Sequence, residues 1–215
     1  MEMRSSRQVD LHEDLDVHSY YKNAKQSVLA TGGGPEIYWQ LTRDAKRFTE
    51  QDLLREAAWV ILCSGFRERV VRRKFDYISM CYGDWQSASH ISSNADICVS
   101  TAYHAFANRS KLRAIAHIAC HVFSVGFAHV QAHLLRDPYR YLVGFPYIGA
   151  VTSRHLLKNL GFPIPKPDRH LVRIASRLGY SSVDQLCAEI SAKTGDPIHV
   201  VDLVLWRHSA GPSYT

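Results

Sequence analysis

The stretch LVGFPYIGAVTSRHLLKNLGFPIPKPDRHLVRIASRLG, residues 142–179, carries most of the information on the fold. Its glycines and prolines predict a tight turn over residues 144–149, and a rigid connector over residues 162–167. Between them lies an apolar helix that begins at Ala150 and that Gly161 closes. Asp168 follows a proline and precedes helix-forming residues, so we expect it to be the N-cap of the next helix. The stretch therefore predicts two helices, one after the turn and one after the connector.

The rest of the chain is also predicted to be helical. Thr49 and the acidic residues after it predict a helix start that opens into the apolar LLREAAWVILC, and Asn108 marks the start of another helix that runs to Gly126. No internal repeat and no run of strand-like alternation is found, so the fold class is all-α. Further helices are expected over residues 19–30 and 36–44, which the breaker segment 31–35 separates, over 66–75 and 126–137, and from about 183 and 197.

Length and composition point to a globular protein with a basic surface. The chain has 215 residues, 46% of them hydrophobic, and a formal net charge of +6, which favours an anionic partner. Five scattered cysteines without a CxxC pair predict reduced thiols. The polar N-terminus and the absence of a long apolar run predict neither secretion nor a membrane span. We expect a flexible arm over residues 1–20, a single helical domain over residues 21–215, and a cytoplasmic location.

Two motifs within the opening stretch resemble those of the helix-hairpin-helix DNA glycosylase superfamily. The hairpin motif corresponds to FPYIG (145–149), and the D-x-H-x-x-R motif corresponds to residues 168–173. The basic segment FRERVVRRKF (66–75) and the helix start NRSKLRAI are similar to the 3-methyladenine DNA glycosylase I branch, so the resemblance runs from about residue 48 to 208. It implies two helical lobes with a cleft between them, with the hairpin unit over residues 142–157. The implied partner is double-stranded DNA with a damaged or modified base, bound by a bacterial, nucleoid-associated monomer that needs no cofactor.

The hairpin is the predicted contact to the DNA backbone. Gly149 would let the chain turn with a positive φ or approach a partner closely. The first amides of the helix that follows, at Val151 and Thr152, would bind a phosphate oxygen, and Tyr147 lies in the turn itself. The alternative is that FPYIG is an ordinary tight turn between two packed helices.

Asp168 is the predicted catalytic carboxylate. As an N-cap alone it would stabilise a helix by roughly 0.5–2 kcal/mol and need no chemistry. As the glycosylase aspartate it would stabilise positive charge on the sugar of an extruded nucleotide and activate water at C1′. Bifunctional relatives use a lysine just after the hairpin, but Ala150, Val151 and Thr152 stand there. We therefore expect a monofunctional enzyme that uses water, with Lys158 on the surface or facing a phosphate.

The segment after the Ser64-Gly65 break is predicted to contact DNA in two ways. Phe66 is the candidate wedge that enters the duplex where the base leaves it. Arg67 and Arg69, together with Arg173 of the D-x-H-x-x-R motif, are candidate contacts to backbone phosphates. The alternative for the basic run is a solvated helix face.

A flipped base needs aromatic faces and a polar group that reads its edge. Trp39 and Trp59 are candidates for the pocket, although most tryptophans belong to a core. Glu56 resembles in placement the acidic base reader of the 3-methyladenine branch, and its alternative is a plain solvated glutamate. The branch suggests alkylated purines as substrates, whereas an aspartate at this place suggests a neutral base that needs more help to leave.

Two further hypotheses remain open. A non-catalytic protein could keep the hairpin for DNA binding without the chemistry. A metal-dependent hydrolase could use the histidine pairs His117/His121 and His129/His133, whose i, i+4 spacing can place two imidazoles on one helix face. No HExxH glutamate accompanies them, so we expect interhelical or surface histidines and no metal.

Overall fold

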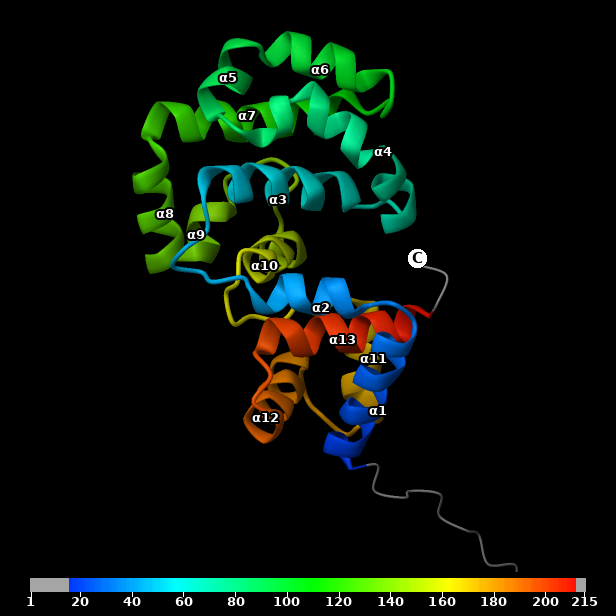
Figure 1. Ribbon diagram of the computed structural model, residues 1–215. Helices are drawn as coiled ribbons and strands as arrows, with labels where there is room; N and C mark the ends of the chain where they lie inside the picture. The colour runs from blue at the N-terminus through cyan, green and yellow to red at the C-terminus, as the bar shows by residue number, and fades with distance from the viewer. Residues whose placement is uncertain (1–15, 212–215) are drawn as a thin grey trace, which may run out of the picture.

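The computed structural model describes residues 16–211, which form thirteen α-helices, one 3-10 helix and no strand (Figure 1). The all-α prediction is confirmed for this range. In chain order the helices are α1 (Val17–Ala30), α2 (Gly34–Leu41), α3 (Glu50–Cys63), α4 (Glu68–Cys81), η1 (Gly83–Trp85), α5 (Ala88–Ser93), α6 (Ala95–Tyr103), α7 (Arg109–Val125), α8 (Phe127–Arg136), α9 (Pro138–Leu142), α10 (Ala150–Asn159), α11 (Arg169–Arg177), α12 (Val183–Thr194) and α13 (Ile198–Ala210).

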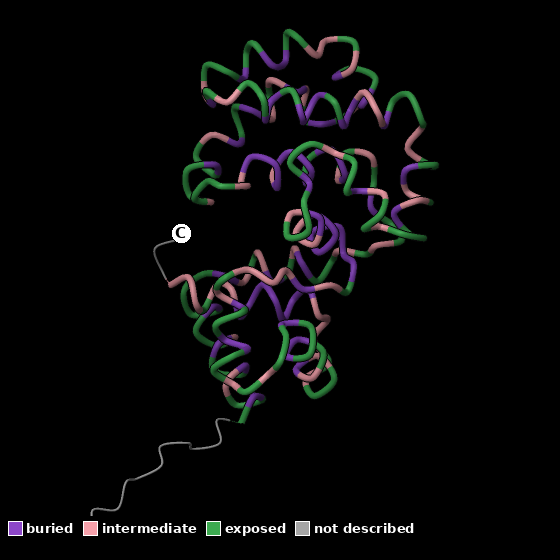
Figure 2. The backbone as a smooth tube through the Cα atoms, turned by 180° about the vertical axis from the view of Figure 1, so that it is seen from behind, coloured by how far each residue is buried: buried purple, intermediate pink, exposed green. Residues whose placement is uncertain are grey.

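The helices gather around two separate hydrophobic cores. The first, called here the upper core, is built by the middle of the chain, α3 to α10. The second, the lower core, is built by both ends of the described chain, α1 and α2 with α11, α12 and α13. Figure 2 shows the buried residues on the inner side of each group. The chain therefore leaves the lower group after α2 and returns to it through the connector before α11.

Helix α3 lies at the centre of the upper core, and local chemistry sets its start. The hydroxyl of Thr49 accepts a hydrogen bond from the amide of Asp52 at 3.1 Å, and the Asp52 carboxylate accepts one from the amide of Thr49 at 2.9 Å. This reciprocal pair is a capping box. The predicted start at Thr49 is confirmed, and the helix is buried on most of its surface.

The two first helices begin earlier than the sequence predicted. The arm expected over residues 1–20 lies outside the described residues except for its last five, and of these Val17 already begins α1. The carboxylate of Asp16 accepts bonds from the amides of His18 and Ser19, which caps the helix there. Gly34 and Pro35, predicted as helix breakers, instead begin α2, because proline is compatible with the first turn of a helix.

Residues 82–107 carry three short elements that no sequence pattern had indicated: η1, α5 and α6. Helix α5 has only six residues, too few to show a helical period. The rings of Tyr82 and Trp85 stack at 5.1 Å and close this segment against the upper core. Pro138, predicted to end a helix, also begins the next one, α9.

No single helix of the described chain combines the length and apolarity that a bilayer crossing needs. Helices α7 and α8 reach that threshold only as a pair, and they are bent by 102° with respect to each other.

Polar contacts join the two groups of helices. Lys158 of α10 forms an ion pair with Asp202 of α13, and both side chains are buried. The amide of Gln40 in α2 donates to the carbonyl oxygen of Lys158 at 3.0 Å. The prediction of a surface or phosphate-facing Lys158 is wrong, because the lower group covers this face of α10.

Candidate functional site

The hairpin joins α9 to α10, and Ile148 anchors it in the upper core. Backbone bonds from the amides of Phe145 and Ile148 to carbonyl oxygens three residues earlier, both 3.1 Å, shape the turn. Of the two roles predicted for Gly149, the positive φ is wrong: Gly149 has φ −93°, and Tyr147 carries the positive φ, 65°. A Cβ added to Gly149 would meet no atom within 4 Å, so the space in front of α10 is open at this point.

Helix α10 begins directly at Ala150, and its first amides have no carbonyl partner one turn earlier in the helix. Val151 is 45% exposed and Thr152 is half-buried. An exposed helix start preceded by an uncrowded glycine is a place where an anion can approach closely. The local geometry therefore suits the predicted phosphate contact.

Lys111, which the sequence analysis did not single out, connects the hairpin to the loop that follows α3. It is buried, and its ammonium donates to the carbonyl oxygens of Ile61 and Ser64 at the end of α3. The same Nζ lies 5.3 Å from the ring centroid of Phe66 and 5.0 Å from that of Tyr147, distances at which a cation attracts an aromatic face. Burial lowers the pKa of Lys111 to about 8.

A sequence signal for Lys111 exists. It shares a helical spacing of i, i+4, i+7 with Ile115 and Ile118, which are also buried, so it lies on the inner face of α7. A lysine on an apolar face needs acceptors, and the last carbonyls of a helix supply them.

The predicted wedge and basic run lie beside this lysine. Phe66 is 43% exposed, and its inner side packs on Phe106 at 5.0 Å. Arg67 and Arg69 are exposed, as a phosphate contact requires. Lys74 differs from them, because its ammonium donates to the carbonyl oxygen of Ala105 at 2.6 Å and so holds α4 against the end of α6.

Asp168 is the N-cap of α11, as predicted. Its Oδ1 accepts hydrogen bonds from the amides of His170 at 2.8 Å and Leu171 at 3.1 Å. Among residues 16–211, Oδ2 accepts no hydrogen bond. The side chain is half-buried, and Arg173, one turn along α11, is exposed. One carboxylate oxygen is thus fixed by the backbone while the other is available.

Two ionisable groups that the sequence predictions did not include, Lys166 and Cys63, interact electrostatically with each other, and Lys166 also interacts with Asp168. Burial, together with the charge of Lys158, lowers the pKa of Lys166, while Asp168 acts in the opposite direction. Burial raises the pKa of Cys63, at the end of α3, to about 12, and the charge of Lys166 opposes that shift. The charge of Lys166 in the connector therefore acts on both Asp168 and Cys63.

Glu56 is buried at 3% exposure, so the alternative of a solvated glutamate is wrong. Its Oε2 accepts a hydrogen bond from the amide of Asn159 at 2.8 Å, and Arg55 pairs with its Oε1. Burial raises its pKa, against the opposing effects of Arg55 and Asn159. Glu56 thus links α3 to α10, and both of its oxygens are engaged.

The two candidate tryptophans lie on different helices and in different surroundings. Trp59 of α3 is partly buried and meets Phe75 edge-on at 5.1 Å, with the guanidinium of Arg72 5.5 Å from its ring centroid. Trp39 of α2 is half-buried, and the guanidinium of Arg43 lies 4.7 Å from its ring centroid. Each ring thus has a cation on one face.

Three of the four paired histidines, His117, His121 and His133, lie beside the aromatic residues that lead into the hairpin, and His129 is exposed. His121 hydrogen-bonds the hydroxyl of Tyr141 through Nε2 at 2.7 Å, and His133 stacks on the same ring at 5.1 Å. His117 meets Phe145 edge-on. Within the described residues, no three histidine, cysteine, aspartate or glutamate side chains stand together as metal ligands.

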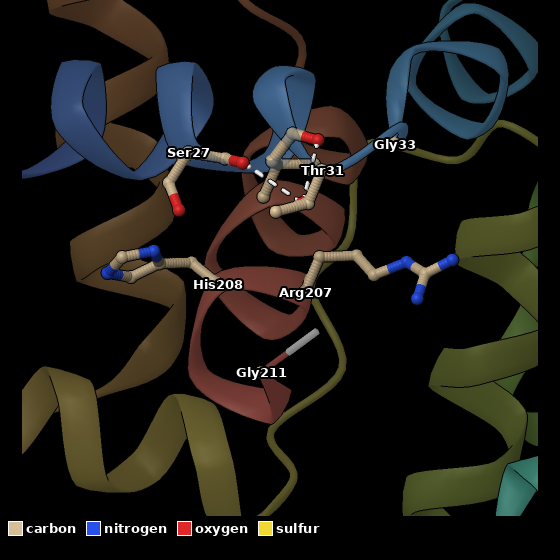
Figure 3. Close-up of a pocket in the computed structure, with 7 residues that line it drawn as sticks. Ser27, Thr31, Gly33, Arg207, His208 and Gly211 are labelled. Carbon is tan, nitrogen blue, oxygen red and sulfur yellow. Dashed lines mark hydrogen bonds between the residues drawn. The ribbon is translucent and has the colours of Figure 1, made fainter. Parts of the chain in front are cut away.

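A small pocket lies between the end of α1 and the end of α13. None of the predicted site residues lines it. Figure 3 shows Arg207 and His208 pointing in opposite directions from α13, with the guanidinium of Arg207 directed away from Ser27. The lining residues are Ser27, Val28, Thr31, Gly33, Arg207, His208 and Gly211.

A scan against models of known protein families finds no match, and a search of curated protein sequences finds none either.

Proposed function

We propose that this protein is a monofunctional DNA glycosylase of the bacterial cytoplasm, which flips a damaged or modified base out of duplex DNA and hydrolyses its N-glycosidic bond. The observation that carries the proposal is the state of Asp168. Two backbone amides hold Oδ1 in place, and Oδ2 has no hydrogen bond from the described residues. A carboxylate oriented in this way is prepared for chemistry on a ligand, because its position is fixed before the substrate arrives.

The chemistry proposed for Asp168 is the hydrolysis of one bond. As the bond between C1′ and the base nitrogen breaks, positive charge develops on the sugar, and the nearby carboxylate stabilises it. Oδ2 accepts a proton from water while the water oxygen bonds to C1′. The base leaves with the bonding electrons and gains a proton from solvent, while Asp168 releases the proton that it took from water, so an abasic site and a free base result.

The surfaces around Asp168 have matching roles in the proposal. The hairpin and the first amides of α10 bind a backbone phosphate. Phe66, with its exposed tip, enters the base stack, and the polar junction between the two helical groups becomes the cleft that receives the flipped nucleotide. Trp59, Trp39 and Glu56 stand as candidates for its lining.

Water, rather than an amine, is the proposed nucleophile. Residues 150–152 carry no lysine, and the ammonium of Lys158 is paired with Asp202 at 2.9 Å. Borohydride should therefore trap no covalent complex with substrate DNA. If borohydride traps a complex with wild type but not with Lys166→Met, the nucleophile is the Lys166 amine and not water.

The test is base release from duplexes that each carry one modified base, followed by alkaline cleavage of abasic sites. We expect strand breaks with at least one alkylated, deaminated, oxidised or hypermodified base. Asp168→Asn should reduce the rate by about 100-fold or more. A control variant, Glu189→Gln on the surface of α12, should retain full activity. No strand break on the whole panel would overturn the enzyme assignment.

The second candidate is a non-catalytic DNA-binding protein. The open helix start of α10 favours it as much as it favours the enzyme, because phosphate binding needs no carboxylate. It predicts that duplex DNA binds to wild type and to Asp168→Asn equally and that no base is released by either.

A further inference from the structure

Three helices from both groups meet at the carboxylate of Glu36. Arg207 of α13 donates to it through Nε at 2.6 Å and through Nη2 at 2.5 Å, one bond to each oxygen. Arg72 of α4 approaches the same Oε1 with its Nη2 at 3.4 Å. We call Glu36, Arg72 and Arg207 the Glu36 cluster.

The Glu36 cluster joins the two hydrophobic cores at the surface. Helix α4 packs in the upper core, and α2 and α13 pack in the lower core. The contact between Arg72 and Glu36 therefore spans the junction in which the proposed function places the nucleotide.

Arg72 is held in a defined orientation although half of its side chain is exposed. Its Nε donates to Glu68 at 2.6 Å, one turn earlier in α4, and its guanidinium lies 5.5 Å from the ring centroid of Trp59. Arg207 is more deeply placed, with a side-chain exposure of 12%. Glu68 thus holds Arg72 through both Nε and Nη2, and the same Nη2 reaches Glu36, which Arg207 also binds.

A carboxylate held by an arginine fork has the same arrangement as two oxygens of a phosphate. Glu36 itself is 28% exposed, so its side chain can turn toward solvent when another anion takes its place. Two further exposed arginines lie near Arg72 on α4: Arg69 is three residues before it, and Arg73 directly follows it. An anion that reaches Arg72 therefore meets further positive charge, as a polyanion would need.

We propose that Arg72 and Arg207 form a binding site for a phosphodiester of the DNA backbone, and that Glu36 fills this site in the free protein as an internal competitor. This inference rests on the proposed function for the identity of the polyanion. It adds a site that the hairpin does not supply, between α4, which directly follows the loop of Phe66, and α13. It also implies that DNA binding breaks an ion pair between the two helical groups.

The test is the salt dependence of binding to undamaged duplex DNA, measured for wild type and Glu36→Gln. Removal of the competing charge should tighten binding about tenfold. The plot of log affinity against log salt should become steeper by about one unit, because one added phosphate contact contributes about 0.9. Adding Arg72→Gln to Glu36→Gln should reverse about one unit of that slope. Arg72 is half exposed, so this variant is expected to fold.

The matched control is Glu189→Gln, which removes one surface carboxylate paired with Lys193 on α12 and so changes the net charge equally. Equal slopes for the two glutamine variants would overturn the inference and leave the proposed function intact. Failure of wild type and both variants to bind duplex DNA would instead remove the proposed function. Saturable binding of inorganic phosphate to Glu36→Gln, without a gain in DNA affinity, would overturn the assignment of the site to nucleic acid.

Discussion

The Nζ of Lys158 lies 2.9 Å from Oδ1 of Asp202, and this buried ion pair joins α10 to α13 across the two helical groups. Asp202 accepts a second hydrogen bond, from the backbone amide of Lys166 at 2.6 Å. Asp202 is thus bound both to Lys158 and to the backbone of the connector that leads to Asp168.

Removal of one partner of this pair should be costly. Lys158→Met leaves the Asp202 charge buried, and we expect a loss of about 3–5 kcal/mol in the free energy of unfolding. The double variant Lys158→Met/Asp202→Asn removes both charges and keeps an acceptor for the Lys166 amide, so it should be more stable than Lys158→Met alone. Urea denaturation measures both. Additive losses in the double variant would contradict a coupled pair.

His155 should make the protein less stable in mild acid. Burial lowers its pKa well below the usual value of 6.5, and the charges of Lys166 and Lys158 add to the effect. The unfolded chain therefore binds more protons than the folded one below about pH 6.5, so stability falls as the pH falls through that value. The contribution is at most about 1.4 kcal/mol per pH unit.

His155→Gln should flatten this dependence between pH 7 and 5, as measured by the midpoint of urea unfolding at each pH. His129→Gln, at an exposed position on α8, is the control and should follow wild type. The hypothesis fails if the two variants show the same slope.

Two substitutions of Asp168 should separate its structural role from its proposed chemical role. Asp168→Ala removes the acceptor for the amides of His170 and Leu171, so it should cost about 0.5–2 kcal/mol of stability. Asp168→Asn keeps an oxygen at this position, and asparagine is as good an N-cap, so its thermal midpoint should stay close to that of wild type. Both should lose base release. Full activity of Asp168→Asn would mean that the residue serves only as a cap.

The positive φ of Tyr147 predicts an unusual order of stability for two small substitutions. A residue with a Cβ is strained at φ 65°, and glycine is not. Tyr147→Ala keeps that strain and loses the contact of the ring with Lys111, whereas Tyr147→Gly loses the contact but relieves the strain. Thermal unfolding should therefore show Tyr147→Gly to be more stable than Tyr147→Ala by about 1 kcal/mol. The reverse order would show that the turn relaxes to a negative φ.

Local signals in the sequence were enough to place most helices. Thr49, Asn108 and Asp168 were each predicted as a helix start, and each side chain accepts a hydrogen bond from an amide two or three residues later. Such a cap depends only on neighbouring residues, so a single sequence contains it. The breaker segment 31–35 was less informative, because Gly34 and Pro35 are compatible both with a turn and with the first turn of a helix.

The sequence by itself determined the all-α class, the hairpin between α9 and α10, and the position of Asp168 at the start of α11. Only the tertiary structure decided which polar side chains are buried and what they meet. Glu56 finds Asn159 at a separation of 103 residues, and Arg207 finds Glu36 at a separation of 171. The physical reason is range: a cap is satisfied within one helical turn, whereas a buried charge is satisfied by whichever distant helix the packing of the two cores brings beside it.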